Sequence, residues 1–196
     1  MKREMKRKGF TLVELLIVIV VIGILSAMMM LSSTEAVSSA RANNIISNLR
    51  NLKTAVLSWY MDNLDRVAIT TGNDGKITKV QITDKEGKNP QNLTVFVNSE
   101  DGNKEILKYL NNGDAVTLKG GTEGSYGDGV YFIKDTKYKN WYICTKVPDA
   151  NVRNKLASRA KNAGLVGKAA PTGDENITTP YSDAQYVGTL VLTLGD

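Results

Sequence analysis

An apolar run near the N-terminus constrains the fold of this chain more than any other feature. The run extends from Phe10 to Leu31, and Glu14 is the only charged residue among its 22 residues. As an α-helix, which rises about 1.5 Å per residue, it would cover roughly 33 Å, enough to cross the hydrocarbon core of a bilayer. The sequence therefore predicts a membrane-spanning helix that carries one carboxylate.

The residues before this run are strongly basic. Five basic residues and one acid precede Gly9: Lys2, Arg3, Lys6, Arg7, Lys8 and Glu4. By the positive-inside rule this flank stays in the cytoplasm and the rest of the chain faces outward. The whole chain has 25 basic and 20 acidic residues, so its formal charge of +5 falls to +1 without residues 1–9. The excess of basic residues belongs to the flank, and we expect no direct nucleic-acid binding.

Two ordinary explanations of the apolar run stay open. A secretory signal has a shorter apolar stretch that ends in a small-residue cleavage site, and Ala27 followed by three methionines fits that pattern poorly. A plain single-pass anchor fits the length and the flanks but does not explain Glu14. A carboxylate at the bilayer centre costs about 2.5–3.5 kcal/mol by insertion scales, and less near the interface, where it can snorkel to the headgroups.

The composition argues against an enzyme. Histidine is absent and Cys144 is the only cysteine, so the chain has no intrachain disulfide and no histidine-based nucleophile. Asp174, Glu175 and Asp183 could supply oxygen ligands to calcium, but their spacing is not that of an EF-hand, and we expect a solvated loop. We therefore expect no cofactor and no metal.

The helical pattern continues after the apolar run with a single apolar face. Residues at three- and four-residue steps form this face: Ile45, Leu49, Leu52, Val56 and Trp59. Because residues 1–89 contain no proline, we predict one helix from Thr11 to Asn63. Its membrane-spanning half ends at residue 31, and its amphipathic half, residues 32–64, would pack on a globular domain. A coiled coil is the alternative, but the apolar spacing lasts for only about three heptads.

Residues 65–196 have the short β-branched runs of an antiparallel sheet. We predict a hairpin within residues 66–83, a second hairpin with strands at 130–134 and 141–147, and other strands at 93–97, 115–119 and 186–196. Helices are predicted near 104–110 and at 148–164, the second between Asp149 and Gly164. The fold class is therefore α+β, with the sheet covering the long helix. Four aromatic residues are expected in its core: Trp59, Tyr131, Phe132 and Trp141.

The stretch KGFTLVELLIVIVVIGIL, which starts at Lys8, resembles the N-terminus of type IV pilins and the related pseudopilins. These families have a short basic leader that ends in glycine, then phenylalanine, a glutamate four residues later and an unbroken apolar helix. Gly9, Phe10 and Glu14 occupy these positions here. The match is strong over about the first 31 residues and weaker to Asn63. It implies the pilin fold, a long N-terminal helix packed on an antiparallel sheet.

The resemblance implies a processing step and an assembly step. A prepilin peptidase would remove the leader, residues 1–9, by cutting between Gly9 and Phe10, and would methylate the new Phe10 amine. When subunits stack through their helices, Glu14 of one subunit can pair with the Phe10 amine of a neighbour and fix the axial register. Gly23 and Ala27, four residues apart, would let helices approach closely.

The implied function is that of a structural subunit of a type IV pilus. The chain would be a single-pass precursor in the lipid of the bacterial cytoplasmic membrane. The pilus assembly machinery would then polymerise it, with itself or with other pilins, into an extracellular filament for adhesion, motility or DNA uptake. A pseudopilin of a type II secretion system is the alternative. The sequence YMDNLDRVAI, after Trp59, lacks the glycine and Tyr-Pro pair common in the major pseudopilin and favours a pilin. A membrane-anchored binding protein or enzyme is a third hypothesis.

Overall fold

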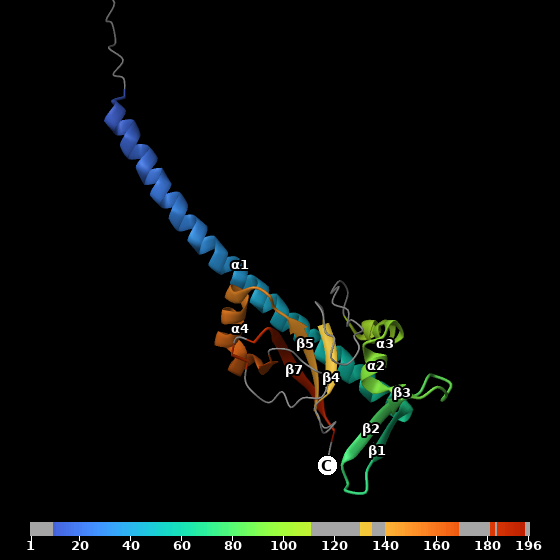
Figure 1. Cartoon of the computed structure of the whole chain (residues 1–196). Helices are drawn as coiled ribbons and strands as arrows, with labels where there is room; N and C mark the ends of the chain where they lie inside the picture. Colours follow the sequence, from blue (N-terminus) through green and yellow to red (C-terminus); the bar gives the residue numbers. More distant parts are fainter. Residues whose placement is uncertain (1–9, 111–129, 135–139, 169–180, 183, 195–196) are drawn as a thin grey trace, which may run out of the picture.

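A long helix and a smaller α+β head make up the computed structural model (Figure 1). The structure describes residues 10–110, 130–134, 140–168, 181–182 and 184–194. Helix α1, Leu12–Asp62, is continuous over 51 residues, with Thr11 as its N-cap and Asn63 as its C-cap. The prediction of one helix between Thr11 and Asn63 is therefore confirmed. Its N-terminal half projects away from the head with no other element beside it (Figure 1).

The head contains two antiparallel sheets and several short helices. One sheet has the strand order β1-β2-β3, and the other has the order β4-β5-β7-β6. This arrangement confirms the α+β class. The elements after α1 are η1 (Leu64–Arg66), β1 (Val67–Thr71), β2 (Ile77–Ile82), β3 (Gln91–Asn92), α2 (Leu93–Val97), α3 (Glu100–Ile106), η2 (Leu107–Tyr109), β4 (Val130–Lys134), β5 (Asn140–Lys146), α4 (Ala150–Ala163), β6 (Leu165–Lys168) and β7 (Tyr186–Thr193).

Both predicted hairpins and the predicted second long helix are present. Strands β1 and β2 pair antiparallel, as do β4 and β5. The side chain of Asp149 caps the start of α4, and Gly164 ends the helix in the left-handed conformation at φ 65°. Glycine adopts this conformation without the steric cost that a side chain would bring, which explains why the helix stops there. The predicted C-terminal strand is β7.

The predicted strand at 93–97 is wrong, because this segment is helix α2. Its buried apolar residues Leu93, Phe96 and Val97 lie at helical spacing, while Val95 between them is exposed. Asn92 caps the helix by accepting a hydrogen bond from the backbone amide of Thr94. Burial on one side and the cap outweigh the strand propensity of the β-branched residues.

Other predictions of the head need correction or lie outside the described residues. The helix predicted near 104–110 begins earlier, at Glu100, because Ser99 is its N-cap, and it ends at Ile106 before the 3-10 turn η2. Strand β6 was not predicted. The predicted strand at 115–119 lies outside the described residues.

The amphipathic half of α1 forms one wall of the hydrophobic core. Leu49, Leu52, Val56 and Trp59 are almost completely buried, and Ile45 is half-buried. Among the predicted aromatic core members, Phe132 and Trp141 are buried and stack with their ring centroids 5.0 Å apart. The side chain of Tyr131 lies outside the described part of the chain. The head therefore depends on the C-terminal half of α1 for its core.

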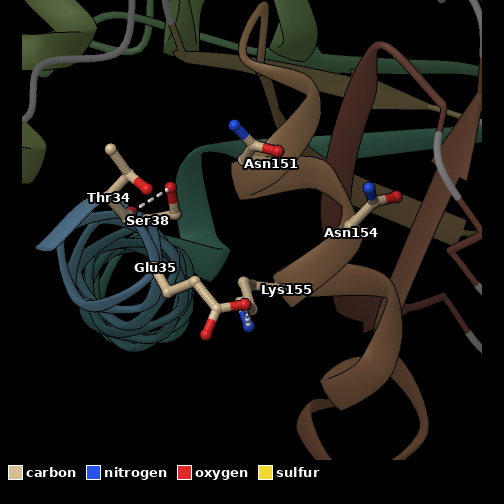
Figure 2. A pocket seen from close by; sticks show the side chains of 6 residues that line it. All are labelled: Thr34, Glu35, Ser38, Asn151, Asn154 and Lys155. Carbon is tan, nitrogen blue, oxygen red and sulfur yellow. Dashed lines mark hydrogen bonds and ion pairs between the residues drawn. The ribbon is translucent and has the colours of Figure 1, made fainter. Parts of the chain in front are cut away.

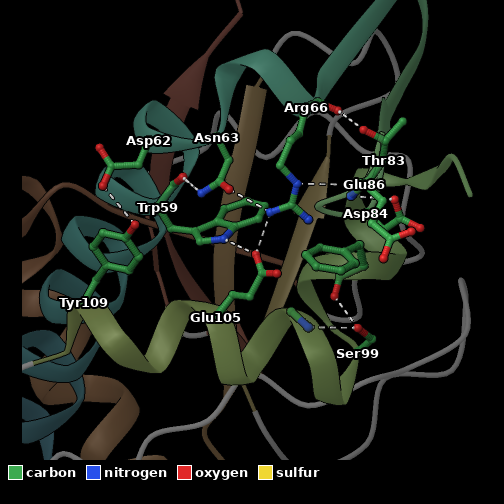
Figure 3. Close-up of polar contacts among 12 residues, drawn as sticks. Trp59, Asp62, Asn63, Arg66, Thr83, Asp84, Glu86, Ser99, Glu105 and Tyr109 are labelled. Atoms are coloured by element: carbon green, nitrogen blue, oxygen red, sulfur yellow. Dashed lines mark hydrogen bonds and ion pairs between the residues drawn. The ribbon is translucent and has the colours of Figure 1, made fainter. Parts of the chain in front are cut away.

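A network of hydrogen bonds connects the C-terminal end of α1 to the rest of the head (Figure 3). Glu105 on α3 accepts hydrogen bonds from the Trp59 indole nitrogen and from Arg66 Nη1, both at 2.9 Å. Arg66 also donates to the carbonyl of Thr83 at 3.0 Å and to Asn63 Oδ1 at 2.7 Å. These contacts join α1, α3 and the end of β2.

Helix α4 is joined to the middle of α1 by polar contacts. Arg159 Nη1 donates to Asn43 Oδ1 at 2.8 Å and to the carbonyl of Ser39 at 3.3 Å. Arg41 and Asp149 form an ion pair of 3.5 Å. The start of α4 therefore lies beside the part of α1 where the helix leaves the head (Figure 1).

Candidate functional site

The N-terminal half of α1 exposes an unusually large apolar surface. Its leucine, isoleucine, valine and methionine side chains from Leu12 to Met30 are all at least 48% exposed. Within the described chain, α1 is the one helix long and apolar enough to cross a membrane. A continuous apolar surface of this length is unfavourable in water and needs lipid or another protein to cover it.

The first turn of this helix contains a capping box. Glu14 Oε2 accepts hydrogen bonds from the backbone amide and from the hydroxyl of Thr11, both at 2.8 Å. In return, the Glu14 amide donates to Thr11 Oγ1 at 3.2 Å. This pair satisfies amide groups that a helix N-terminus leaves without partners. The capping role of Thr11 was not predicted, although a threonine three residues before a glutamate at the start of an apolar run is the usual signal.

Phe10 lies immediately outside the helix. It precedes the N-cap Thr11 and is 89% exposed. Both hydrogen bonds from Thr11 go to Glu14 Oε2, so Oε1 has no hydrogen bond to any described residue. The structure thus places the residue after the predicted cleavage point one turn from a carboxylate with an available oxygen. Gly9 itself lies outside the described residues.

Gly23 and Ala27 lie one turn apart on the exposed part of α1. A Cβ atom added at Gly23 would meet no atom within 4 Å, so this glycine is not required by packing within the subunit. Small residues four apart form a shallow surface against which another helix can pack closely. The structure places these two residues on the same surface as the large apolar side chains.

The head shows no catalytic arrangement in its described part. No group of three or more acidic, histidine or cysteine residues there could hold a metal ion. The three acidic residues weighed as calcium ligands (Asp174, Glu175 and Asp183) lie outside the described residues. Cys144 is buried, and burial raises the pKa of its thiol to about 12, which disfavours the reactive thiolate.

Comparisons with known proteins agree with this arrangement. The model of the prokaryotic N-terminal methylation motif matches residues 5–30. A fimbrial protein of Pseudomonas aeruginosa is 30% identical over 137 residues, which cover 67% of this chain and 87% of that protein. The chain belongs to the type IV pilin superfamily. Pilins are structural subunits, so the chain is not an enzyme.

Two other relatives match shorter parts of this pilin. The type IV major pilin protein PilE of Neisseria gonorrhoeae is 29% identical over 104 residues, 51% of this chain and 62% of that protein. The fimbrial protein EcpB of Eikenella corrodens is 45% identical over 53 residues, 27% of this chain and 33% of that protein. No solved structure matches the chain.

Proposed function

We propose that this pilin is a subunit of a type IV pilus, made as a single-pass precursor in the cytoplasmic membrane and polymerised through α1. The observation that carries the proposal is the exposed apolar half of α1, which begins with the Thr11–Glu14 capping box beside Phe10. Lipid covers this surface in the precursor, and the helices of other pilins cover it in the filament. The basic flank before Gly9 keeps the N-terminus in the cytoplasm.

Processing by a prepilin peptidase removes residues 1–9 and methylates the amine of Phe10. The match to the methylation motif supports this step, and so does the position of Phe10 outside the helix, where the chain is exposed. The new ammonium group lies at the positive end of the helix dipole, which is unfavourable for a cation. A nearby carboxylate offsets that cost, and Glu14 is one turn away.

Assembly brings the Phe10 ammonium group of one subunit to Glu14 of a neighbour. In this arrangement Oε2 keeps its bonds to Thr11, and Oε1 accepts the bond from the incoming ammonium group. A buried carboxylate without a cation is costly in an apolar interior, so only the register that pairs the two groups is stable. Gly23 and Ala27 allow the helices to pack closely around this pair.

The fimbrial relatives favour a pilus over the short filament of a type II secretion pseudopilin. Adhesion, motility and DNA uptake are then properties of the filament. Mass spectrometry of shed filaments tests the proposal directly, and we expect a mature N-terminus at methylated Phe10. A subunit that keeps residues 1–9 in a host with prepilin peptidase contradicts it. Deleting the gene should remove surface fibres, whereas loss of secretion with intact fibres favours the pseudopilin.

A further inference from the structure

A polar cavity of about 200 Å³ lies in the angle between α1 and α4 (Figure 2). Its volume corresponds to on the order of six water molecules in the liquid, so a small polar group fits inside. Neither the apolar surface of α1 nor the hydrophobic core of the head uses this space. Six side chains line it, all of them polar: Thr34, Glu35, Ser38, Asn151, Asn154 and Lys155.

The cavity lies at the depth of the lipid headgroups when the apolar half of α1 spans the bilayer. The apolar run ends at Leu31, so at about 1.5 Å per residue Thr34 and Ser38 lie roughly 5 and 10 Å beyond it. The headgroup layer on each side of the hydrocarbon core is about 5–8 Å thick. Figure 2 looks along α1 and shows Glu35 and Lys155 meeting between this helix and α4, with Asn151 and Asn154 projecting from α4.

The cavity presents one acidic and one basic group close together. Lys155 Nζ lies 3.6 Å from Glu35 Oε1, and the two side chains are 34% and 76% exposed. An ion pair of this length and exposure contributes at most about 1 kcal/mol, so a ligand that carries both charges can replace it. The side-chain amides of Asn151 and Asn154 make no hydrogen bond to a described residue and can serve the same ligand.

We propose that this cavity binds the phosphoethanolamine headgroup of a membrane phospholipid in the precursor. The phosphate accepts hydrogen bonds from Lys155 and the two asparagine amides, and the primary ammonium group donates to Glu35. This inference rests on the membrane-spanning precursor of the proposed function. It adds a contact that holds the head against the membrane and that must break when the subunit enters the filament.

The paired charges favour this headgroup over other phospholipids. A phosphoglycerol headgroup has the phosphate but no cation, so it leaves the Glu35 carboxylate beside a second anion. A phosphocholine headgroup is zwitterionic, but its quaternary ammonium group has no hydrogen to donate to that carboxylate. Of these three headgroups, only phosphoethanolamine has a primary ammonium group, so only it satisfies both charged side chains with hydrogen bonds.

Lipid retention by the full-length chain tests the inference. The chain is reconstituted into vesicles of phosphatidylcholine alone, or with phosphatidylethanolamine or phosphatidylglycerol added, and purified by flotation. Native mass spectrometry after release in mild detergent then identifies the bound lipid. We expect one phosphatidylethanolamine per chain, and about tenfold less in the Glu35→Gln and Lys155→Gln variants. Soluble phosphoethanolamine at the same concentration should not bind, because the acyl chains supply part of the affinity.

Matched controls come from a second exposed ion pair. Glu100 and Lys104 lie 2.8 Å apart on α3, away from the cavity, so Glu100→Gln and Lys104→Gln should retain the lipid as the unmodified chain does. A chain that floats with vesicles but shows no preference for the ethanolamine lipid overturns this inference alone. Equal retention in the cavity and control variants also overturns it. A chain that does not float at all contradicts the membrane precursor itself, and the inference with it.

Discussion

Thr11 and Glu14 form reciprocal hydrogen bonds at the first turn of α1. The Glu14 carboxylate accepts from the Thr11 amide and hydroxyl, and the Glu14 amide donates to the Thr11 hydroxyl oxygen. One carboxylate oxygen therefore stabilises the helix end within the subunit, while the other has no partner among the described residues. This division makes the cap and the charge of Glu14 experimentally separable.

Glu14→Gln should separate the two roles. Glutamine can act in a capping box, but it carries no charge to pair with an ammonium group. We expect normal membrane insertion and leader removal, with at least a tenfold loss of filaments in a shear-and-sediment assay followed by immunoblotting. Glu100→Gln, which neutralises an exposed acid on the head, should leave the filament yield unchanged. A normal yield from Glu14→Gln contradicts the role of the charge.

Thr11→Val should weaken assembly without removing the carboxylate. Valine has nearly the shape of threonine but no hydroxyl, so the Glu14 amide loses its acceptor and Oε2 loses one of its two donors. Loss of an N-cap costs about 1 kcal/mol, and we expect a partial fall in filament yield, smaller than that of Glu14→Gln. Thr11→Ser keeps the hydroxyl and should assemble normally. Equal defects in the two Thr11 variants indicate that the methyl group matters and the cap does not.

Gly23→Leu should impair assembly and leave the subunit folded. In the monomer no atom lies within 4 Å of a Cβ at this position, and leucine has a higher helix propensity than glycine. In the filament the larger side chain would hold neighbouring helices apart. The measurements are circular dichroism of the chain in detergent and filament yield. Ile24→Leu, a change of shape at constant volume on the next residue, is the control and should assemble normally.

The parts of the fold that the sequence predicted well are those with signals in the local sequence. Helix α1 has an unbroken apolar pattern and no proline, and α4 has Asp149 at its start and Gly164 at its end. The spacing of Gly9, Phe10 and Glu14 is also a local signal, and the assembly role that it suggests stays a prediction. None of these features depends on contacts between distant segments.

The parts that sequence reasoning missed depend on tertiary contacts. The segment from Leu93 to Val97 has strand propensity but is a helix, because Phe96 packs against Trp59 with ring centroids 5.8 Å apart. The close approach of α3 to α2 also needs Gly102, since a Cβ there would overlap the backbone of Phe96. The cavity between α1 and α4 is lined by residues more than a hundred positions apart in the sequence, so no local sequence pattern predicts it.

Glu105→Ala should destabilise the head by about 2–3 kcal/mol, because it leaves the Trp59 indole without its acceptor and removes the carboxylate that pairs with the largely buried Arg66 guanidinium. Urea unfolding of the full chain in detergent, followed by tryptophan fluorescence, measures the change. Glu100→Ala removes an exposed carboxylate from the same helix and should have no measurable effect. A similar effect of both changes contradicts the importance of the network.

The same network predicts how stability depends on pH. Burial raises the pKa of the Glu105 carboxyl, but hydrogen bonds from Arg66 and Trp59 outweigh burial and leave the pKa below its ordinary value of 4.5. A lowered pKa in the folded state means that the stabilisation is complete above pH 4.5 and is lost as the pH falls further. The unmodified chain should therefore lose stability more steeply below pH 4.5 than Glu105→Ala does. Parallel pH profiles for the two proteins contradict this assignment.

Gly188→Ala should open the larger sheet and expose Cys144. The two residues are directly opposite each other on β7 and β5, and a Cβ at Gly188 would overlap Cys144 Sγ and lie 2.8 Å from the carbonyl oxygen of Ile143. Overpacking of this kind costs about 1–3 kcal/mol. In the unmodified protein the thiol is buried, so iodoacetamide at pH 8 should label it only when the sheet opens. Cys144 should therefore be labelled faster in the Gly188→Ala variant.

A second change, Cys144→Ala, removes the overlapping sulfur from the Gly188→Ala variant and should recover part of its free energy of unfolding. The recovery is only partial because the carbonyl of Ile143 stays in place. An unchanged rate of Cys144 labelling in Gly188→Ala contradicts the prediction, because it shows that β5 and β7 accept the methyl group without exposing the thiol.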